Sequence, residues 1–176
     1  MSRTHRELIL YTDGACSPNP GPGGYGVVLI SDGKRRELAG GFRRTTNNRM
    51  ELLSVIRGLQ AVAEPGCSVT IYCDSQYVVS MYNGGYVRQW QRDGWTRNKG
   101  KDPALNSDLW SDLLDLCARE DVRLVWVRGH ADNAENTRCD QLAVQARQAA
   151  DLPVDEGYET PAVPVLARQL TLFEGM

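Results

Sequence analysis

The sequence predicts an α/β fold built on a mixed five-stranded sheet, in which three antiparallel strands are followed by parallel strands and helices flank the sheet. Two observations lead to this prediction. The N-terminal quarter of the chain holds three β-rich runs joined by turn signals, which is typical of antiparallel hairpins. From residue 47 onward, helical and strand patterns alternate, which favours parallel pairing with helices packed against the sheet.

The three N-terminal strands are expected at about residues 7–13, 25–31 and 35–42. The first run alternates apolar and polar residues and ends at Asp13. A Pro- and Gly-rich stretch, residues 17–24, predicts a loop before the second strand. Asp32-Gly33 separates the second and third runs and is a strong hairpin signal, because both residues tolerate the backbone angles of a tight turn.

The rest of the domain is expected to alternate between helices and strands. Thr46 or Asn47 can cap a helix that runs to about Ala63, where Pro65-Gly66 stops it. Apolar residues at helical spacing support this helix and another near residues 109–117. The remaining expected elements are a strand at 68–73, a short helix from about Ser75, a strand at 122–127 and a helix at 136–150.

The composition divides the chain into a folded domain, residues 1–150, and a tail, residues 151–176. The domain contains a basic, glycine-containing excursion at about residues 84–106. The tail is rich in proline and acid, so we expect it to be flexible. It holds five acidic residues and one arginine, a charge of −4, and the net charge of −2 therefore leaves the domain at +2. A weakly basic domain with clustered cations permits a polyanionic partner without requiring one.

Signals for membranes and for disulfides are missing from the sequence. No apolar run is long enough to span a bilayer, and no apolar signal core follows the first six residues. The five cysteines are odd in number and form no C-x-x-C pair, as expected of reduced thiols. We therefore expect a cytoplasmic protein without membrane association. We also expect a monomer, although the sequence carries no signal of oligomeric state.

Four carboxylates stand at positions that suit a metal site. Asp13 and Asp74 end predicted strands, and ligands often bind at the carboxyl ends of strands in sheets with parallel pairing. Glu51 lies near the start of the first helix and Asp140 early in the last one. Without a set of cysteine and histidine ligands, such oxygens suit Mg²⁺ or Mn²⁺ rather than zinc. Each residue alone fits a turn, a cap or a solvated surface equally well, so only the combination indicates a site.

Six short blocks of sequence are Tyr11–Gly14, Asn19–Gly26, Thr45–Glu51, Asp74–Val78, Trp126–Ala131 and Glu135–Asp140. Together they resemble type 1 ribonuclease H, in particular its bacterial members. The blocks occur in the family's order and cover roughly residues 7 to 150. The resemblance implies the ribonuclease H-like fold, which agrees with the strands and helices expected above.

The resemblance also implies an activity for residues 1–150, which would form the catalytic domain of a nuclease. It would be an endonuclease that hydrolyses the RNA strand of RNA–DNA hybrids and leaves 3′-hydroxyl and 5′-phosphate ends. The family's catalytic residues correspond to Asp13, Glu51, Asp74, His130 and Asp140, and the four carboxylates among them would bind metal. The implied cofactor is Mg²⁺, two ions per active site with substrate, with Mn²⁺ as a substitute. One ion would activate the water and the other would stabilise the leaving 3′-oxygen, with Asp13 bridging both.

His130 would assist proton transfer or product departure, for which an imidazole titrating near neutral pH is suited. After it the sequence reads Ala131-Asp132-Asn133, where bacterial members carry glycine and often a second histidine. We expect Asp132 either to raise the pKa of His130 or to stiffen the loop.

Polar side chains near the carboxylates match the family's contacts with the hybrid. The residues expected to reach RNA 2′-hydroxyls and minor-groove edges are Asn19, Asn47, Asn48 and Gln76. The residues expected to grip a DNA phosphate are Arg44, Thr46 and Asn106. Helix capping and turn formation are the alternative roles of such residues, and Thr46 can serve both.

The excursion at residues 84–106, here called the handle, resembles the basic protrusion of bacterial members. Its five basic residues are expected to contact the DNA backbone, and Trp90 a DNA sugar. The alternative is that Trp90 and Trp95 belong to the core of a helical subdomain. Trp110 and Trp126 are expected in the main core.

Two other functions stay open. One is a different nuclease of the same fold, and the other is a hybrid-binding module that does not cut. The block from Asn47 to Glu51 and the handle argue against another nuclease. A pure binding module has no reason to hold four mutually repelling carboxylates together.

Near its end the tail reads Gln169-Leu170-Thr171-Leu172-Phe173, which resembles the short peptide by which bacterial replication and repair proteins dock on the sliding clamp. The expected docking residues are Gln169, Leu170, Leu172 and Phe173. Large apolar side chains in a flexible tail need a surface to pack against, and a tether leaves the catalytic domain free to reach its substrate. The alternative is that these residues fold back onto the domain as an extra strand or a small helix.

Overall fold

The structure is a computed structural model that describes residues 6–129 and 133–160. Its main sheet has five strands in the order β3-β2-β1-β4-β7. The strands are β1 (Glu7–Cys16), β2 (Gly21–Ser31), β3 (Lys34–Thr45), β4 (Ser68–Cys73) and β7 (Asp121–Trp126). β2 pairs antiparallel with both β1 and β3, whereas β4 pairs parallel with both β1 and β7. The expected mixed five-stranded sheet is therefore confirmed.

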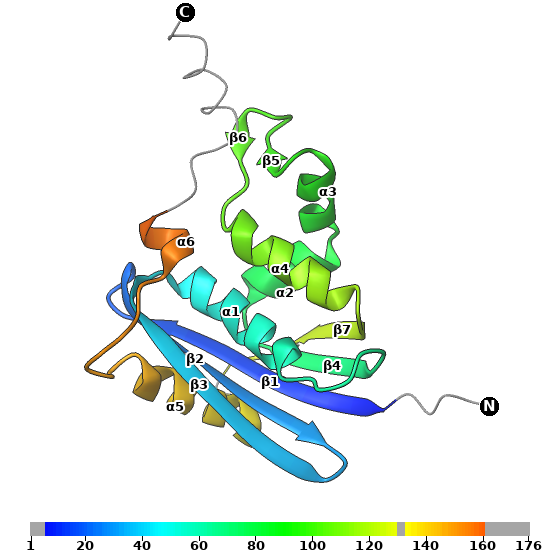
Figure 1. The fold of residues 1–176 in the computed structure, drawn as a ribbon, viewed down its shortest axis with the longest axis vertical. Coiled ribbons are helices and arrows are strands. Elements are labelled where there is room, and N and C mark those ends of the chain that lie inside the picture. Colours follow the sequence, from blue (N-terminus) through cyan, green and yellow to red (C-terminus); the bar gives the residue numbers. More distant parts are fainter. Residues whose placement is uncertain (1–5, 130–132, 161–176) are drawn as a thin grey trace, which may run out of the picture.

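Helices cover both faces of this sheet (Figure 1). One layer holds α1 (Asn47–Gln60), α2 (Gln76–Asn83) and α4 (Ser107–Cys117), and α5 (Ala134–Ala146) packs against β1 and β2 on the opposite face. The handle contains α3 (Tyr86–Arg92) and a two-stranded hairpin of β5 (Thr96–Arg97) and β6 (Asp102–Pro103). A short helix, α6 (Glu156–Glu159), follows α5.

The main core lies between the sheet and the layer that contains α1. Its fully buried side chains include Leu10 from β1, Met50 from α1, Ile71 from β4 and Trp110 from α4. A smaller cluster, Val28, Cys139 and Leu142, joins α5 to the other face of the sheet. Because apolar side chains pack on both faces of the sheet, β1 and β4 are held rigidly at the point where their paired region ends.

Local signals in the sequence set several element boundaries. The Thr46 hydroxyl accepts a hydrogen bond from the backbone nitrogen of Arg49 at 3.3 Å and caps α1. Ser75 caps α2 in the same way. Asp32 and Gly33 have φ angles of 50° and 72°, the left-handed conformations that a two-residue hairpin turn requires.

Several elements differ in extent from the expectation. β2 begins at Gly21, inside the loop that was expected at residues 17–24, and β3 continues to Thr45, beyond the expected residue 42. α1 ends at Gln60, before the expected residue 63. β1 continues past Asp13 to Cys16, because its pairing with β2 extends to the pair Cys16 and Gly23. Asp13 therefore lies inside a strand and not at its end. α5 begins at Ala134, after Asn133 as the cap, and ends at Ala146, short of the expected residue 150.

The tryptophans divide between core and surface. Trp110 is fully buried, as expected. The expectation for Trp126 was wrong: it is the last residue of the edge strand β7 and is 43% exposed, with its indole nitrogen donating to the Asp74 carbonyl at 3.1 Å. Trp90 and Trp95 are half-buried and pack against the main core, which is the alternative considered for them.

Residues 151–160, here called the C-terminal strap, pack against β3 and α1. The Pro153 carbonyl accepts a hydrogen bond from the backbone nitrogen of Arg43 at 2.9 Å. Asp155 is 5% exposed and accepts hydrogen bonds from the Thr45 hydroxyl at 2.6 Å and from the Arg49 guanidinium at 2.8 Å. This segment differs from the flexible tail expected from its composition, because Asp155 finds a buried partner 106 residues earlier in the chain.

Within residues 6–129 and 133–160, no helix is long and apolar enough to cross a membrane. All five cysteines lie in these ranges and are free thiols.

Candidate active site

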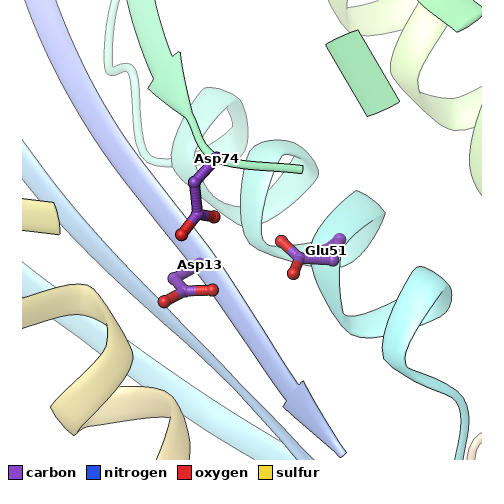
Figure 2. A group of neighbouring side chains, drawn as sticks. All are labelled: Asp13, Glu51 and Asp74. Atoms are coloured by element: carbon purple, nitrogen blue, oxygen red, sulfur yellow. The ribbon is translucent and has the colours of Figure 1, made fainter. Parts of the chain in front are cut away.

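Two carboxylates lie side by side where β1 and β4 separate (Figure 2). Parallel pairing of the two strands ends at Thr12 and Cys73, and the next residues are Asp13 and Asp74. Asp13 is 6% exposed, and its Oδ1 accepts a hydrogen bond from the backbone nitrogen of Gly14 at 2.7 Å. The ends of the paired region thus present two acids at one edge of the sheet.

Glu51 reaches the same place from the second turn of α1 (Figure 2). It is 6% exposed. The close approach of α1 to β1 depends on Gly14, because a Cβ at this position would overlap the backbone nitrogen of Glu51. Asn47 Nδ2 donates to Glu51 Oε1 at 3.5 Å, whereas Glu51 Oε2 has no hydrogen-bond partner among the described residues.

These three residues form a compact acidic cluster. One oxygen from each of Asp13, Glu51 and Asp74 lies within 4.8 Å of the others. Burial, and then the charges of Asp74 and Asp140, raise the pKa of Asp13 to about 8. Burial, and then the charges of Asp13 and Asp74, raise the pKa of Glu51 well above its usual value. Carboxylates held this close and this poorly solvated can all ionise only if a cation compensates them.

Asp140 joins the cluster from α5. It lines the same cavity of about 350 Å³ as the other three acids. α5 is held in place beside it, because the Cys139 thiol donates to the Tyr11 carbonyl at 3.2 Å and Leu142 packs in the smaller core. The structure therefore brings together all four carboxylates that the sequence singled out.

The donor set fits a hard divalent cation. The cluster consists of carboxylates alone, which suit Mg²⁺ or Mn²⁺ better than zinc. Glu51 Oε2 is buried and unpartnered within the described part of the chain, so it is available as a ligand atom. A bound cation would favour the ionised form of each carboxylate and so counter the raised pKa of Asp13.

The residues expected to contact RNA border this cluster to different degrees. Asn47 lines the cavity, and its backbone nitrogen donates to Asn19 Oδ1 at 3.2 Å. Asn19 thereby ties the loop between β1 and β2 to the start of α1. Asn48 and Gln76 are less constrained: they lie in the first turns of α1 and α2, and both are exposed.

The three residues expected to grip a DNA phosphate lie at element ends. Arg44 is exposed near the end of β3. Asn106 precedes α4 in a left-handed conformation, with φ of 56°, and its Nδ2 donates to the Tyr77 hydroxyl at 3.3 Å. Thr46 caps α1, so its hydroxyl already accepts one hydrogen bond and remains able to donate another.

The basic side chains of the handle face solvent, whereas its tryptophans face the core. The exposed basic residues are Arg88, Arg92, Arg97, Lys99 and Lys101. Because Trp90 and Trp95 are half-buried against the main core, only part of each ring is accessible to a partner. The outer surface of the handle therefore offers charge more than aromatic area.

Two residues beside Asp74 were not among the site residues expected from the sequence. Asn136 is 1% exposed, and its Nδ2 donates to Asp74 Oδ2 at 3.2 Å. A Cβ at Gly129 would lie 2.7 Å from the same oxygen, so a larger residue there would displace the Asp74 carboxylate. The signal for Asn136 was present, because it stands four residues before Asp140 on one helix and so projects to the same side.

Several expected residues lie outside the described ranges. They are His130, Asp132, Gln169, Leu170, Leu172 and Phe173. Of the described residues that flank residues 130–132, Gly129 approaches Asp74, and Asn133 caps the helix that carries Asp140.

Comparison with known proteins points to one family. The family model described as RNase H matches residues 5–148. A ribonuclease H from Syntrophus aciditrophicus (strain SB) is 56% identical over 153 residues, which are 87% of this chain and 87% of that protein. A ribonuclease H from Trichodesmium erythraeum (strain IMS101) is 53% identical over 159 residues, which are 90% of this chain and 100% of that protein.

Solved structures agree with this comparison. LC9-RNase H1, described as a type 1 RNase H with the type 2 active-site motif, superposes with a TM-score of 0.74 at 31% identity, over 96% of this chain and 86% of that chain. LC11-RNase H1 in complex with an RNA/DNA hybrid superposes with a TM-score of 0.60 at 26% identity, over 79% of this chain and 95% of that chain.

Proposed function

This chain belongs to the RNase H family, and on that premise we propose that Asp13, Glu51, Asp74 and Asp140 hold the cations with which it works. The chain is a metal-dependent endoribonuclease that cleaves the RNA strand of RNA–DNA hybrids. The observation that carries the proposal is the convergence of carboxylates from β1, α1, α5 and the residue after β4 on one cavity. A surface that only bound the hybrid would gain nothing from this repulsion.

The cations are Mg²⁺, two per site when the hybrid is bound, and Mn²⁺ substitutes for them. When bound, they supply an activated water and positive charge beside the leaving 3′-oxygen, so that the products carry 3′-hydroxyl and 5′-phosphate ends. Asp13 would be the central one of the four residues that hold the ions, since the charges of both Asp74 and Asp140 act on it. Asn136 keeps the Asp74 carboxylate in one orientation through its hydrogen bond to Oδ2.

His130 assists proton transfer or product departure. Its neighbour Gly129 lies against Asp74, which supports a position for the imidazole close to the reacting phosphate. The expected loss of kcat for His130→Ala is roughly 10²-fold. The pH profile of Asp132→Asn tests whether Asp132 raises the pKa of His130, in which case the profile moves to lower pH in this variant.

The hybrid is held on both strands. Asn19, Asn47, Asn48 and Gln76 contact RNA 2′-hydroxyls, and Arg44, Thr46 and Asn106 contact a DNA phosphate. The handle contacts the DNA backbone through its basic residues, with the accessible part of Trp90 against a sugar. Neutralising Arg88, Arg92, Lys99 and Lys101 together should flatten the salt dependence of binding by roughly 0.9 for each phosphate that is no longer bound, with little change in the rate at saturation.

The catalytic domain spans residues 1–150, and the C-terminal strap completes its packing. The chain acts as a monomer in the cytoplasm. The four carboxylates that line the cavity all come from one chain. The five free thiols fit a reducing compartment.

Gln169, Leu170, Leu172 and Phe173 dock on a replication sliding clamp. The support is the sequence pattern and its separation along the sequence from Asp140, the last of the four carboxylates, which leaves the catalytic domain free when the tail is bound. A binding titration against the purified clamp compares the intact chain with the double variant Leu172→Ala, Phe173→Ala. Equal affinity of both, or binding by neither, removes this proposal.

Cleavage of matched RNA–DNA, RNA–RNA and DNA–DNA duplexes with added Mg²⁺ tests the function. Only the RNA strand of the hybrid should be cut, with 5′-phosphate ends, and Asp13→Asn serves as the inactive control. Cleavage of another duplex at a similar rate would favour a different nuclease of the same fold. Binding of the hybrid without any cleavage would favour the non-cutting module.

A further inference from the structure

An arginine lines the cavity that holds the carboxylates. Arg147 directly follows α5 and continues its helical backbone, with φ of −66° and ψ of −13°. It borders the cavity together with Asp13 and Asp140. A cation is favourable at the C-terminal end of any helix, whichever way it faces. The helix dipole therefore explains a cation at the end of α5, but it does not explain why Arg147 borders this cavity.

The guanidinium of Arg147 is anchored but not neutralised. Its Nη1 donates to the Ser17 carbonyl at 3.1 Å, while the backbone nitrogen of Ser17 donates to the Pro22 carbonyl at 3.2 Å and closes the loop. Its Nε is buried without a hydrogen-bond partner among the described residues. Within those same residues Arg147 forms no ion pair, whereas Arg49 and Arg138 each bind acids. An arginine that is held in place and forms no ion pair is suited to an anion that arrives with the substrate.

We propose that Arg147 binds a phosphate of the RNA strand close to the scissile one, an inference that rests on the function and the carboxylate site proposed above. Asp140 and Arg147 are seven residues apart on one helical path, which is about 10 Å along its axis. Side chains in helices lean toward the N-terminus, so the guanidinium extends back toward Asp140. Phosphates of one strand recur about every 3.4 Å along the duplex axis. A strand with its scissile phosphate at the carboxylates therefore passes Arg147 within a few nucleotides.

The contact offsets a cost that the carboxylates impose. Four acids attract cations but repel a polyanion that must enter the same cavity. Arg147 places a permanent positive charge on the side of the cavity that faces the Ser17 loop, and its planar fork matches the oxygens of a phosphate. Because the contacted phosphate does not react, its interaction with Arg147 is equally strong in the ground state and the transition state. Removal of this interaction should raise KM and leave kcat nearly unchanged.

Arg147→Met and Arg147→Lys test the proposal on the full chain with the hybrid as substrate. The methionine variant keeps most of the side-chain length and removes the charge. It should raise KM about tenfold at low salt, as expected when a charge-assisted hydrogen bond is removed. It should also lower the slope of log KM against log salt by about 0.9. The lysine variant keeps the charge and should keep the slope. The matched control is Arg119→Gln, which removes an exposed charge just beyond α4, and it should behave as wild type.

Single methylphosphonate linkages, introduced one at a time along the RNA strand, identify the contacted phosphate. At that linkage the wild type should lose affinity, and Arg147→Met should lose nothing further, because this variant no longer binds the phosphate. Additive losses at every linkage, or an unchanged salt slope, would overturn the proposal and leave Arg147 as a tie for the Ser17 loop. Failure of the proposed function is distinguishable, because in that case the wild type itself would not cut the hybrid.

Discussion

Two buried charged residues stand two positions apart at the start of α1, and their surroundings are opposite. Arg49 is 3% exposed and pairs with Asp108 at 2.7 Å and with Asp155 at 2.8 Å. Glu51 is 6% exposed and faces Asp13 and Asp74, with one oxygen unpartnered among the described residues. The chain satisfies the first charge by itself. It leaves the second in a cluster of like charges, which needs bound protons or an external cation to be neutralised.

This difference separates a structural cluster from a functional one. The Arg49 cluster joins three parts of the chain, namely the first turn of α1, Asp108 in α4 and Asp155 in the C-terminal strap. It thus fixes the first turn of α1, directly before the turn from which Glu51 projects. A buried cluster whose charges repel lowers stability, so its presence in a well-packed domain marks a place where ligand binding outweighs stability.

The largest effect is expected from Asp13→Asn. This variant should have no measurable cleavage and near-normal hybrid binding, because it removes one of the four proposed cation ligands. In Mg²⁺-free buffer it should unfold at a higher temperature than the wild type, since one of the repelling charges is gone. Steady-state cleavage, hybrid binding and thermal unfolding measure the three quantities. Near-normal turnover would contradict the assignment of the metal site.

In the satisfied cluster, Asp155→Ala should lower the free energy of unfolding by about 3 kcal/mol, because it leaves the buried Arg49 with one partner in place of two. Denaturant titration measures this decrease. The matched control is Glu159→Ala, which removes another acid of the strap, one that pairs with the exposed Arg43. It should change stability far less. Equal decreases in both variants would mean that the packing of the strap, and not the Arg49 pair, stabilises the domain.

A smaller effect is expected from Asn136→Ala, which removes the hydrogen bond to Asp74 but keeps all four carboxylates. We expect activity at limiting Mg²⁺ to fall about 10- to 100-fold, with partial recovery at high Mg²⁺, because the ligand is present but no longer oriented. Cleavage rates over a Mg²⁺ titration measure this. Asn83→Ala is the control, since Asn83 donates to the Leu124 carbonyl away from the cluster. A decrease in activity that high Mg²⁺ does not reverse would indicate a folding defect instead.

The smallest effect concerns pH. The pKa of Asp13 is raised to about 8 in the folded chain, against about 4 for an exposed aspartate. The folded state therefore binds more protons between these values, and the free energy of unfolding in Mg²⁺-free buffer should fall as the pH rises through this window. The slope should reach about 1 kcal/mol per pH unit for this carboxyl. Denaturant titrations across the window should give a flatter dependence for Asp13→Asn, and an identical slope in both proteins would contradict the raised pKa of Asp13.

The sequence predicted the elements whose boundaries depend on nearby residues. Residues 68–73 form β4 as expected, because a short alternating apolar run stands between Pro65-Gly66 and Asp74. The start of α1 was also predictable, because Thr46 is a local cap. The four carboxylates could be identified from their residue types and from the family resemblance. That they converge depends on the sheet order, which no single strand specifies.

What the sequence could not predict depends on distant partners. The acidic, proline-containing composition of residues 151–160 favours a flexible tail, and only the pairing of Asp155 with Arg49 makes this segment a strap. Trp126 was expected in the core because it is large and apolar, but it lies at the end of an edge strand where nothing covers the ring fully. Asn136 was missed because its role is to orient another residue.

The spacing of the carboxylates depends on Gly14, because this residue has no Cβ and so lets α1 lie close to β1. The separation between Asp13 and Glu51 depends on how closely a helix can lie on a strand, and that limit is set by the residue between them, which ligates nothing. Apolar positions in the core tolerate changes of similar volume. The tolerance of a coordination shell is about 0.2 Å, far less than the shift that a methyl group at position 14 would impose. The relative position of the Asp13 and Glu51 carboxylates is therefore set by the close contact between β1 and α1 at Gly14.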